Sequence, residues 1–296
     1  MQIARLYIAV TLLLTAGAAA AETNFGTLYN YGRYANAAYG GPAQIDGIAR
    51  ATGYQVEHMG TDAQTGVGYF LATNEARRHQ IIAVRGTANA QNAVTDLDFK
   101  LRRDTYADTD VHQGFSVAAQ NVYDQIRTKF RRDFTINTTG HSLGGAVALV
   151  LAMYLQHDGY TVGEIVTFGQ PKVSTRPAAE HFGKLNLTRV VTPDDMVPLV
   201  PPFDPSDIAN LNVAIYWHLG KEVILFPGRT YSVLQGLDSM LRGLTALEKP
   251  PSEQNLASHT MDEYLALIRQ KGKEPVRIPF DQRAAHLDKY PAPSPL

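Results

Sequence analysis

The strongest chemical signal in the sequence is a serine enclosed by glycines. Ser142 stands within Gly140-His141-Ser142-Leu143-Gly144-Gly145. A β-branched run at 134–139 precedes this hexapeptide and an apolar run at 146–154 follows it, so the local pattern is strand, tight turn, helix. That is the context of a nucleophile elbow, in which small neighbours permit a strained turn that exposes the serine hydroxyl. The backbone N–H of Leu143 then faces the oxygen of an attacked carbonyl group.

The same turn has two other possible interpretations, a chance glycine-rich turn and a phosphate-binding loop. A glycine-rich turn can contain a serine by chance, because G-x-S-x-G patterns recur in unrelated proteins. The strand before it and the helix after it argue against chance. A phosphate-binding loop ends in Gly-Lys-Ser/Thr, and no lysine follows Gly144 and Gly145. We therefore interpret Ser142 as a nucleophile.

Such a serine needs an acid and a base, which in this type of enzyme follow it in the order Ser, Asp, His. An apolar strand pattern at 187–191 leads into Thr192-Pro193-Asp194-Asp195, a rigid turn with two adjacent carboxylates. Both Asp194 and Asp195 are candidates for the acid. The alternative is a solvated acidic turn that caps the strand.

The candidate bases are drawn from nine histidines. His259 lies on a loop just before a helical pattern, and it follows both candidate acids in the chain. His218 lies within a strand pattern beside Trp217, where packing is the commoner explanation. His141 adjoins the nucleophile and is expected to be a packing residue, because neighbours on such a turn point apart. We favour His259 as the general base.

A second oxyanion donor is expected at the end of an earlier strand. The strand pattern at 80–84 leads into Arg85-Gly86-Thr87, and Thr87 occupies the position from which such enzymes supply that donor. A plain strand-to-loop turn explains the same residues, but the elbow downstream favours the functional interpretation. The following segment, 88–97, is a candidate helix covering the site.

Strand and helix patterns alternate along the chain. Strand patterns occur at 66–73, 80–84, 134–139, 164–168, 187–191, 213–219 and 222–226, and helix patterns at 29–39, 115–130, 146–154, 231–247 and 261–268. The strands at 66–73 and 80–84 predict a hairpin, and those at 213–219 and 222–226 predict a hairpin or an edge-strand pair. The alternation predicts an α/β fold with a mainly parallel central sheet and helices on both faces.

Composition places limits on the class of protein. The chain has 296 residues, 45% of them hydrophobic, and a formal net charge of −1, which argues against a nucleic-acid partner. Residues 1–21 carry an apolar core and an Ala19-x-Ala21 motif, so we predict a cleaved signal peptide and a secreted or periplasmic protein without a transmembrane segment. The absence of cysteine excludes disulfides and thiolate metal sites. We predict a domain at 22–272 and an extended tail at 273–296.

In these features the chain resembles the class 3 (fungal-type) lipases of the α/β-hydrolase superfamily. The resemblance extends from about residue 29 to about residue 268, and the order of its motifs is more specific than any one of them. The motifs are Val84-Arg85-Gly86-Thr87, Val111-His112-Gln113-Gly114-Phe115, Thr139-Gly140-His141-Ser142-Leu143-Gly144-Gly145, Val166-Thr167-Phe168-Gly169-Gln170-Pro171, Arg189-Val190-Val191 through Asp195-Met196-Val197-Pro198, and His259 ahead of Tyr264.

Position by position, the resemblance implies catalytic roles. It implies Ser142 as nucleophile, Asp195 rather than Asp194 as acid, and His259 as base. It also implies an oxyanion hole formed by Thr87 and Leu143, which are the last two of the expected site residues.

The resemblance further implies a lipid ester substrate, met at a lipid–water interface, and no metal or organic cofactor. A secreted triacylglycerol lipase is the simplest hypothesis; a phospholipase A1 or short-chain carboxylesterase is a close variant. A non-catalytic lipid- or protein-binding member of the fold and a serine peptidase are alternatives of other classes. The segment at 88–97 departs from the family because it lacks a large aromatic residue, so we expect only modest interfacial activation. The sequence leaves the oligomeric state open.

Overall fold

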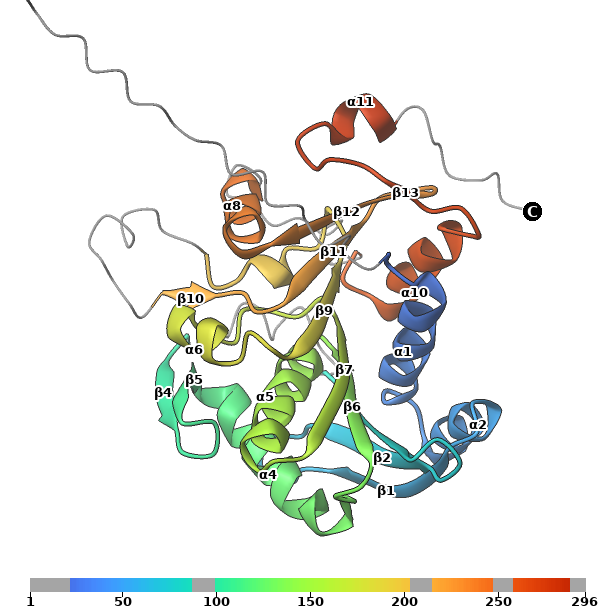
Figure 1. The fold of residues 1–296 in the computed structure, drawn as a ribbon, viewed down its shortest axis with the longest axis vertical. Helices are drawn as coiled ribbons and strands as arrows, with labels where there is room; N and C mark the ends of the chain where they lie inside the picture. The colour runs from blue at the N-terminus through green and yellow to red at the C-terminus, as the bar shows by residue number, and fades with distance from the viewer. Residues whose placement is uncertain (1–21, 87–98, 203–214, 247–257, 288–296) are drawn as a thin grey trace, which may run out of the picture.

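A nine-stranded sheet forms the centre of the computed structural model, which describes residues 22–86, 99–202, 215–246 and 258–287 (Figure 1). In spatial order its strands are β1 (Gln55–Thr61), β2 (Gly68–Asn74), β3 (His79–Val84), β6 (Thr135–His141), β7 (Thr161–Phe168), β9 (Asn186–Val191), β11 (Lys221–Leu225), β12 (Thr230–Gln235) and β13 (Val276–Arg277). The consecutive pairs from β3 to β11 are parallel, whereas β1–β2, β2–β3 and β11–β12 are antiparallel. The predicted mainly parallel sheet is confirmed.

Helices cover both faces of this sheet (Figure 1). One face carries α1 (Phe25–Ala37), α2 (Pro42–Ala51) and α10 (Met261–Gln270), and the other carries α4 (Gln113–Ile126) and α5 (Leu143–His157). Each side has its own apolar core. The predicted α/β fold, with helices on both faces, is therefore confirmed.

The helix that follows the elbow is apolar on all sides. Every residue of α5 from Gly144 to Leu155 is buried, because the helix lies between the sheet and α4. A helix enclosed in this way has little freedom to shift, and it fixes the position of the turn at its N-terminus.

A small antiparallel sheet was not predicted. Its order is β10 (Tyr216–Trp217), β8 (Ser174–Thr175), β5 (Thr109–His112) and β4 (Leu101–Asp104). The predicted pairing of 213–219 with 222–226 is wrong, because β10 pairs with β8 while β11 pairs with β9 and β12. Strand β11 is buried along most of its length and needs a partner on each edge, which leaves none of its edges for β10.

The predicted helix at 231–247 begins later than expected. Residues 230–235 form β12, where Tyr231 and Val233 lie opposite Leu225 and Val223 of β11, and α8 (Gly236–Ala246) follows. Apolar residues two apart satisfy a strand as well as they satisfy the helical spacing, and the cross-strand partners decide between them. Neither α2 nor β1 was predicted.

The remaining elements are short. They are α6 (Arg176–His181), α11 (Arg283–Leu287) and the 3-10 turns η1 (Arg127–Lys129) and η2 (Val197–Leu199). The predicted extended tail at 273–296 contains β13 and α11 within its described part. The predicted signal peptide at 1–21 and the candidate cover at 88–97 lie outside the described residues. Within the described ranges, no helix combines the length and the apolar character needed to cross a membrane.

A cluster of buried charged side chains joins strands β9 and β11 to α8. The carboxylate of Glu222 accepts hydrogen bonds from Arg242 at 2.7 Å and from Arg189 at 3.4 Å, and all three side chains are almost fully buried. Ser239 of α8 bridges the Arg189 and Glu222 side chains. Burial raises the pKa of the Glu222 carboxyl, but Arg242 and Arg189 outweigh this effect and hold it below its usual value. The cluster therefore depends on a charged Glu222.

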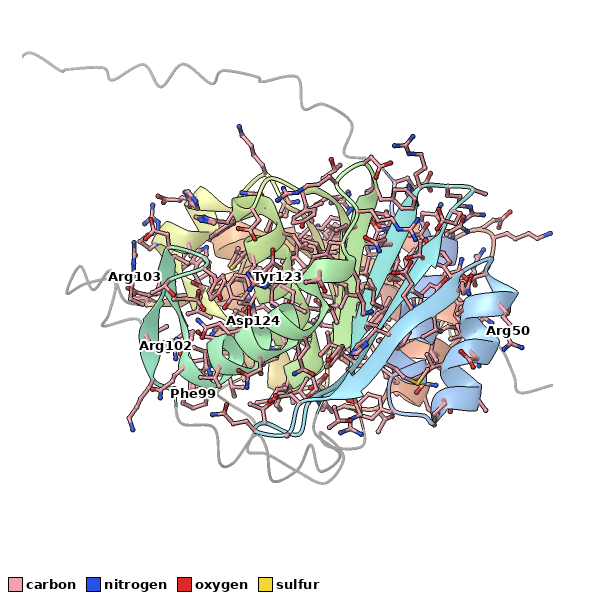
Figure 2. The ribbon with its side chains drawn as sticks, turned by 90° about the horizontal axis from the view of Figure 1, so that it is seen from below. Arg50, Phe99, Arg102, Arg103, Tyr123 and Asp124 are labelled. Atoms are coloured by element: carbon pink, nitrogen blue, oxygen red, sulfur yellow. The ribbon has the colours of Figure 1, made fainter. Side chains whose placement is uncertain are left out.

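We predict that Glu222→Gln lowers the free energy of unfolding by roughly 3–5 kcal/mol at pH 7, because it removes the negative charge that faces the buried Arg189 guanidinium. Chemical denaturation measures this change. The control is Asp46→Asn, which removes the exposed partner of Arg50 on the outer side of α2 (Figure 2). That change is expected to cost less than about 0.5 kcal/mol. Similar small losses in both variants would contradict a structural role for the cluster.

Candidate active site

Ser142 lies on the predicted elbow between β6 and α5. Its backbone has φ 58° and ψ −132°, a conformation that non-glycine residues rarely adopt. The Ser142 N–H donates to the Phe168 carbonyl of β7 at 2.8 Å, and the Ser142 carbonyl accepts from the Gly145 N–H at 2.9 Å. These bonds to the neighbouring strand and to the following helix hold the strained residue in place.

The glycines around Ser142 are required by close contact. A Cβ atom on Gly140 would lie 2.3 Å from the Gly144 carbonyl oxygen, and one on Gly144 would lie 2.3 Å from the Val84 carbonyl oxygen. Both contacts are with backbone atoms, which cannot turn aside as a flexible side chain can. The absence of side chains thus allows β6, α5 and the end of β3 to meet at the serine.

The residues expected to form the oxyanion hole lie on two segments. Leu143 is the first residue of α5, so its N–H has no acceptor within the helix. The end of β3 lies against the serine, since a Cβ atom on Gly86 would be 3.0 Å from the Ser142 Cβ. Thr87 follows Gly86 directly, but it lies outside the described residues.

Asp195 and His259 form a buried pair. The Nδ1 atom of His259 lies 2.7 Å from Oδ2 of Asp195, and both side chains are almost completely shielded from solvent. The Asp195 carboxylate also accepts hydrogen bonds from the Val197 N–H at 2.9 Å and from the Tyr264 hydroxyl. The neighbouring Asp194 is exposed. Of the two adjacent carboxylates, the structure thus brings Asp195 to the histidine.

The ring of His259 is packed on two sides. A Cβ atom on Gly169 would lie 2.7 Å from its Cε1, and the His141 ring lies 4.5 Å away between centroids. Its Nε2, opposite the nitrogen that faces Asp195, is buried and has no hydrogen-bond partner within the described chain. Ser142 is the next residue after His141, yet the Ser142 hydroxyl is not hydrogen-bonded to the His259 Nε2. Hydrogen bonds of this kind are often long without substrate and tighten when substrate binds.

His141 is a packing residue, as predicted, but its ring does not point away from the site. It packs on His259, and its Nδ1 lies 2.8 Å from the hydroxyl of Tyr39, which also accepts a hydrogen bond from the Gly86 N–H at 3.1 Å. Burial lowers the pKa of His141 well below its usual value, and the neighbouring His259 lowers it further. A neutral His141 can accept a hydrogen bond from the Tyr39 hydroxyl, so this tyrosine connects the loop after β3 to the elbow.

The rival histidine occupies a different environment. His218 is buried, and burial lowers its pKa well below the usual value, with additional effects from the nearby basic side chains Arg189, Lys172 and Arg242. It therefore belongs to the surroundings of the ion cluster, and the Asp195 carboxylate pairs with His259 instead. This agrees with the predicted packing role of His218.

Three contributors to the site were missed in the sequence: Tyr39, Tyr264 and Gly169. Tyr39 closes the first helical pattern and Tyr264 lies on the last helix, so their hydroxyls reach the site only through the tertiary fold. The chain has 15 tyrosines, and no local pattern distinguishes Tyr39; Tyr264 appeared in a motif, but its contact with Asp195 could not be inferred from spacing. Gly169 appeared in a motif, but its contact with the His259 ring could not be inferred from spacing. Among the described residues, no group of three or more acidic or histidine side chains is placed to hold a metal ion.

A comparison with known families identifies the core that carries this geometry. Residues 81–204 match the family described as lipase (class 3). This core belongs to the class 3 lipase family. The class 3 lipase match begins in β3, includes the elbow and Asp195, and ends before His259.

Individual relatives of the class 3 lipase core agree with this identification. The secreted mono- and diacylglycerol lipase 1 of Fusarium solani is 36% identical over 148 residues, which is 47% of this chain and 44% of the relative. Lip2 lipase from Yarrowia lipolytica is 26% identical, with a TM-score of 0.57 over 69% of this chain and 79% of that chain. The mono- and diacylglycerol lipase of Aspergillus oryzae is 23% identical, with a TM-score of 0.68 over 82% and 99%, and shares the fold. The chain aligns with less than half the length of the curated relatives that it matches.

We predict that Gly144→Ala destabilises the protein by roughly 3 kcal/mol, because the new methyl group would overlap the backbone of β3. The matched control is Gly47→Ala on α2, where a Cβ atom meets nothing within 4 Å and stability should stay equal or rise by up to about 1 kcal/mol. Thermal or chemical unfolding of both variants measures the difference. If Gly144→Ala were as stable as Gly47→Ala, the close approach of α5 to β3 would be incorrect.

Proposed function

We propose that this protein hydrolyses carboxylic esters of lipids through an acyl-serine intermediate, with Ser142, His259 and Asp195 as its catalytic residues. The single observation that carries the proposal is the buried Asp195–His259 pair packed beside the elbow, with the second ring nitrogen of His259 bonded to none of the described residues. A serine on a strained turn at a helix N-terminus is the nucleophile that such a pair activates.

The chemistry proceeds in two halves. As Ser142 Oγ attacks the ester carbonyl carbon, Nε2 of His259 takes the hydroxyl proton, and Asp195 orients and stabilises the resulting imidazolium. The N–H of Leu143 and the donor from Thr87 bind the oxyanion. When the tetrahedral intermediate collapses, the bond to the alkoxy oxygen breaks and the alcohol leaves with the proton from His259. A water molecule then loses a proton to His259 as its oxygen attacks the acyl carbon. The bond from that carbon to Ser142 Oγ breaks, Oγ takes the proton back from His259, and the fatty acid leaves.

The substrate proposed is an acylglycerol. Two of the similar proteins are named as mono- and diacylglycerol lipases, which supports a glyceride with at least one free hydroxyl as well as the triacylglycerol expected from the sequence. Phospholipase A1 and short-chain carboxylesterase activities require the same chemistry at the serine and differ in the alcohol that leaves or in the length of the acyl chain. A net charge of −1 gives no reason to expect a nucleic-acid partner.

We also propose that the protein is exported and meets its substrate at a lipid–water interface. The signal-peptide pattern at 1–21 supports export, and the Fusarium solani relative is named as a secreted lipase. This proposal can be checked by N-terminal sequencing of the mature protein recovered outside the cytoplasm.

We predict that Ser142→Ala lowers ester hydrolysis by about 10,000-fold or more, because one hydroxyl carries the covalent step. The purified protein is assayed on p-nitrophenyl esters from butyrate to palmitate, on tributyrin, on mono- and diolein, and on phosphatidylcholine. Circular dichroism serves as the control for folding. Turnover by a folded Ser142→Ala variant close to that of the parent protein would remove Ser142 from the mechanism.

The two adjacent carboxylates provide a matched pair of variants. Asp195→Asn should lower kcat by roughly 10,000-fold, because an amide cannot hold His259 in the required tautomer. Asp194→Asn should leave kcat nearly unchanged, since that side chain is exposed. Steady-state kinetics on p-nitrophenyl butyrate compares them, and the reverse order of effects would reject Asp195 as the acid.

A further inference from the structure

A buried lysine holds the segment that follows Asp195. Lys172 lies just after the end of β7 and is only 2% exposed. Its Nζ donates to the carbonyls of Leu199 at 3.0 Å and Pro201 at 2.6 Å, and its backbone N–H donates to the Val200 carbonyl at 2.9 Å. One residue thus binds the carbonyls of three successive positions.

Apart from the bonds of the Asp195 carboxylate to His259 and Tyr264, the segment from Asp195 to Pro201 is bonded mainly within itself. The Asp195 N–H donates to the Thr192 hydroxyl, the Leu199 N–H to the Met196 carbonyl, and the Val200 N–H to the Val197 carbonyl. These local bonds give the turn its shape but do not fix its position in the protein. The bonds from Lys172 connect it to the end of β7, which is also the strand whose Phe168 carbonyl holds Ser142.

We propose that Lys172 is a positioning residue for Asp195: its amine fixes residues 199–201 against the end of β7 and thereby keeps the carboxylate in place at His259. This inference rests on the proposed function for its catalytic consequence. The expected structural consequence, a disturbed Asp195–His259 hydrogen bond, does not depend on the activity.

The surroundings of Lys172 favour a neutral amine. Burial is the largest cause of a lowered Lys172 pKa, the cations Arg189 and Arg242 lower it as well, and Glu222 opposes them, so that the pKa is about 7. His218 also lies near enough to Lys172 for its own titration to be affected. A neutral amine has two N–H groups, which match the two carbonyl acceptors, whereas an ammonium would carry a third N–H and an additional charge beside two arginines.

The chain offers a matched control in Lys271. This lysine is fully buried at the end of α10, its Nζ donates to the Gly228 carbonyl at 2.8 Å and to that of Phe226, and burial lowers its pKa to about 7. It has the same chemistry as Lys172 but lies at the opposite end of this ten-residue helix from His259, about 15 Å along the axis. Lys271→Met therefore removes an equivalent buried amine without touching the acid turn.

Both lysines should make stability depend on pH in the same direction. Because their folded-state pKa is lowered, the unfolded chain binds more protons between pH 7 and 10.5, and stability rises with pH across that range. This contribution to stability declines as the pH falls from 10.5 and is lost once the pH has fallen through the folded-state pKa of about 7. In the parent protein each lysine raises the folding equilibrium constant by up to about tenfold per pH unit across this range, and the corresponding Met variant should lose that contribution. A similar change in both variants shows that the two lysines are matched in their proton linkage to folding.

Activity should separate the two variants. With p-nitrophenyl butyrate at pH 8, Lys172→Met should lower kcat by about 100-fold with little change in KM, because a small displacement of Asp195 misorients the base. Lys271→Met should stay within about threefold of the parent protein. In an Asp195→Asn background, Lys172→Met should cause no further loss, since it acts through a carboxylate that is already absent. Equal losses in both lysine variants, or fully additive losses in the double variant, would overturn the inference.

A readout independent of activity separates this inference from the proposed function. In protein with ¹⁵N-labelled histidine, the Nδ1–H proton of His259, bonded to Asp195, should give a downfield NMR resonance in the parent protein and in Lys271→Met. It should be lost or broadened in Lys172→Met. If the parent protein hydrolyses none of the esters but this pattern holds, the positioning role stands and the proposed function fails. If the resonance is unchanged in Lys172→Met, the positioning role is wrong.

Discussion

The close approach of β3, β6 and α5 at the elbow is the constraint on which the rest of the site depends. Ser142 keeps its strained conformation because its N–H is bonded to β7 and its carbonyl to the first turn of α5. The strain is tolerated because α5 is enclosed by apolar side chains from both the sheet and α4. A less buried helix could relax at its first turn, and the serine would then leave the unusual backbone conformation.

The other site residues are supplied by the loops that follow successive strands. Gly86 follows β3, Ser142 follows β6, Gly169 follows β7 and Asp195 follows β9, so the parallel order of the sheet brings them to one edge. His259 comes from the segment before α10, which packs on the opposite side from α5. The rings of His141 and His259 meet where these two layers approach each other. At this edge of the sheet, the contacts that pack the two layers together also set the positions of the site residues.

The elbow and the fold class could be predicted because their signals are local. A glycine-enclosed serine between a strand and a helix, and the alternation of strands and helices, are visible in short windows. Strand pairing is harder to predict: β10 and β11 were expected to pair with each other, but β10 pairs with β8 and β11 with β9 and β12, and such pairing depends on residues far apart in the chain. Burial was not visible either. Asp194 and Asp195 are chemically identical neighbours, and their different exposure, like the contacts of Tyr39 and Tyr264, arises only when α1 and α10 pack on the sheet.

The packing of α10 on α1 has a consequence for the order of events during synthesis. These helices lie side by side (Figure 1), Gly32 of α1 allows Leu265 to approach within van der Waals distance, and Arg269 binds the hydroxyl of Tyr29 across 240 positions of sequence. A ribosome makes α1 more than 200 residues before α10, so the side of α1 that packs on α10 stays uncovered until α10 has been made. The histidine beside Asp195 arrives with that same late helix. Assembly of the complete site therefore waits until α10 has been made, and before that point the chain carries Ser142 and Asp195 without His259.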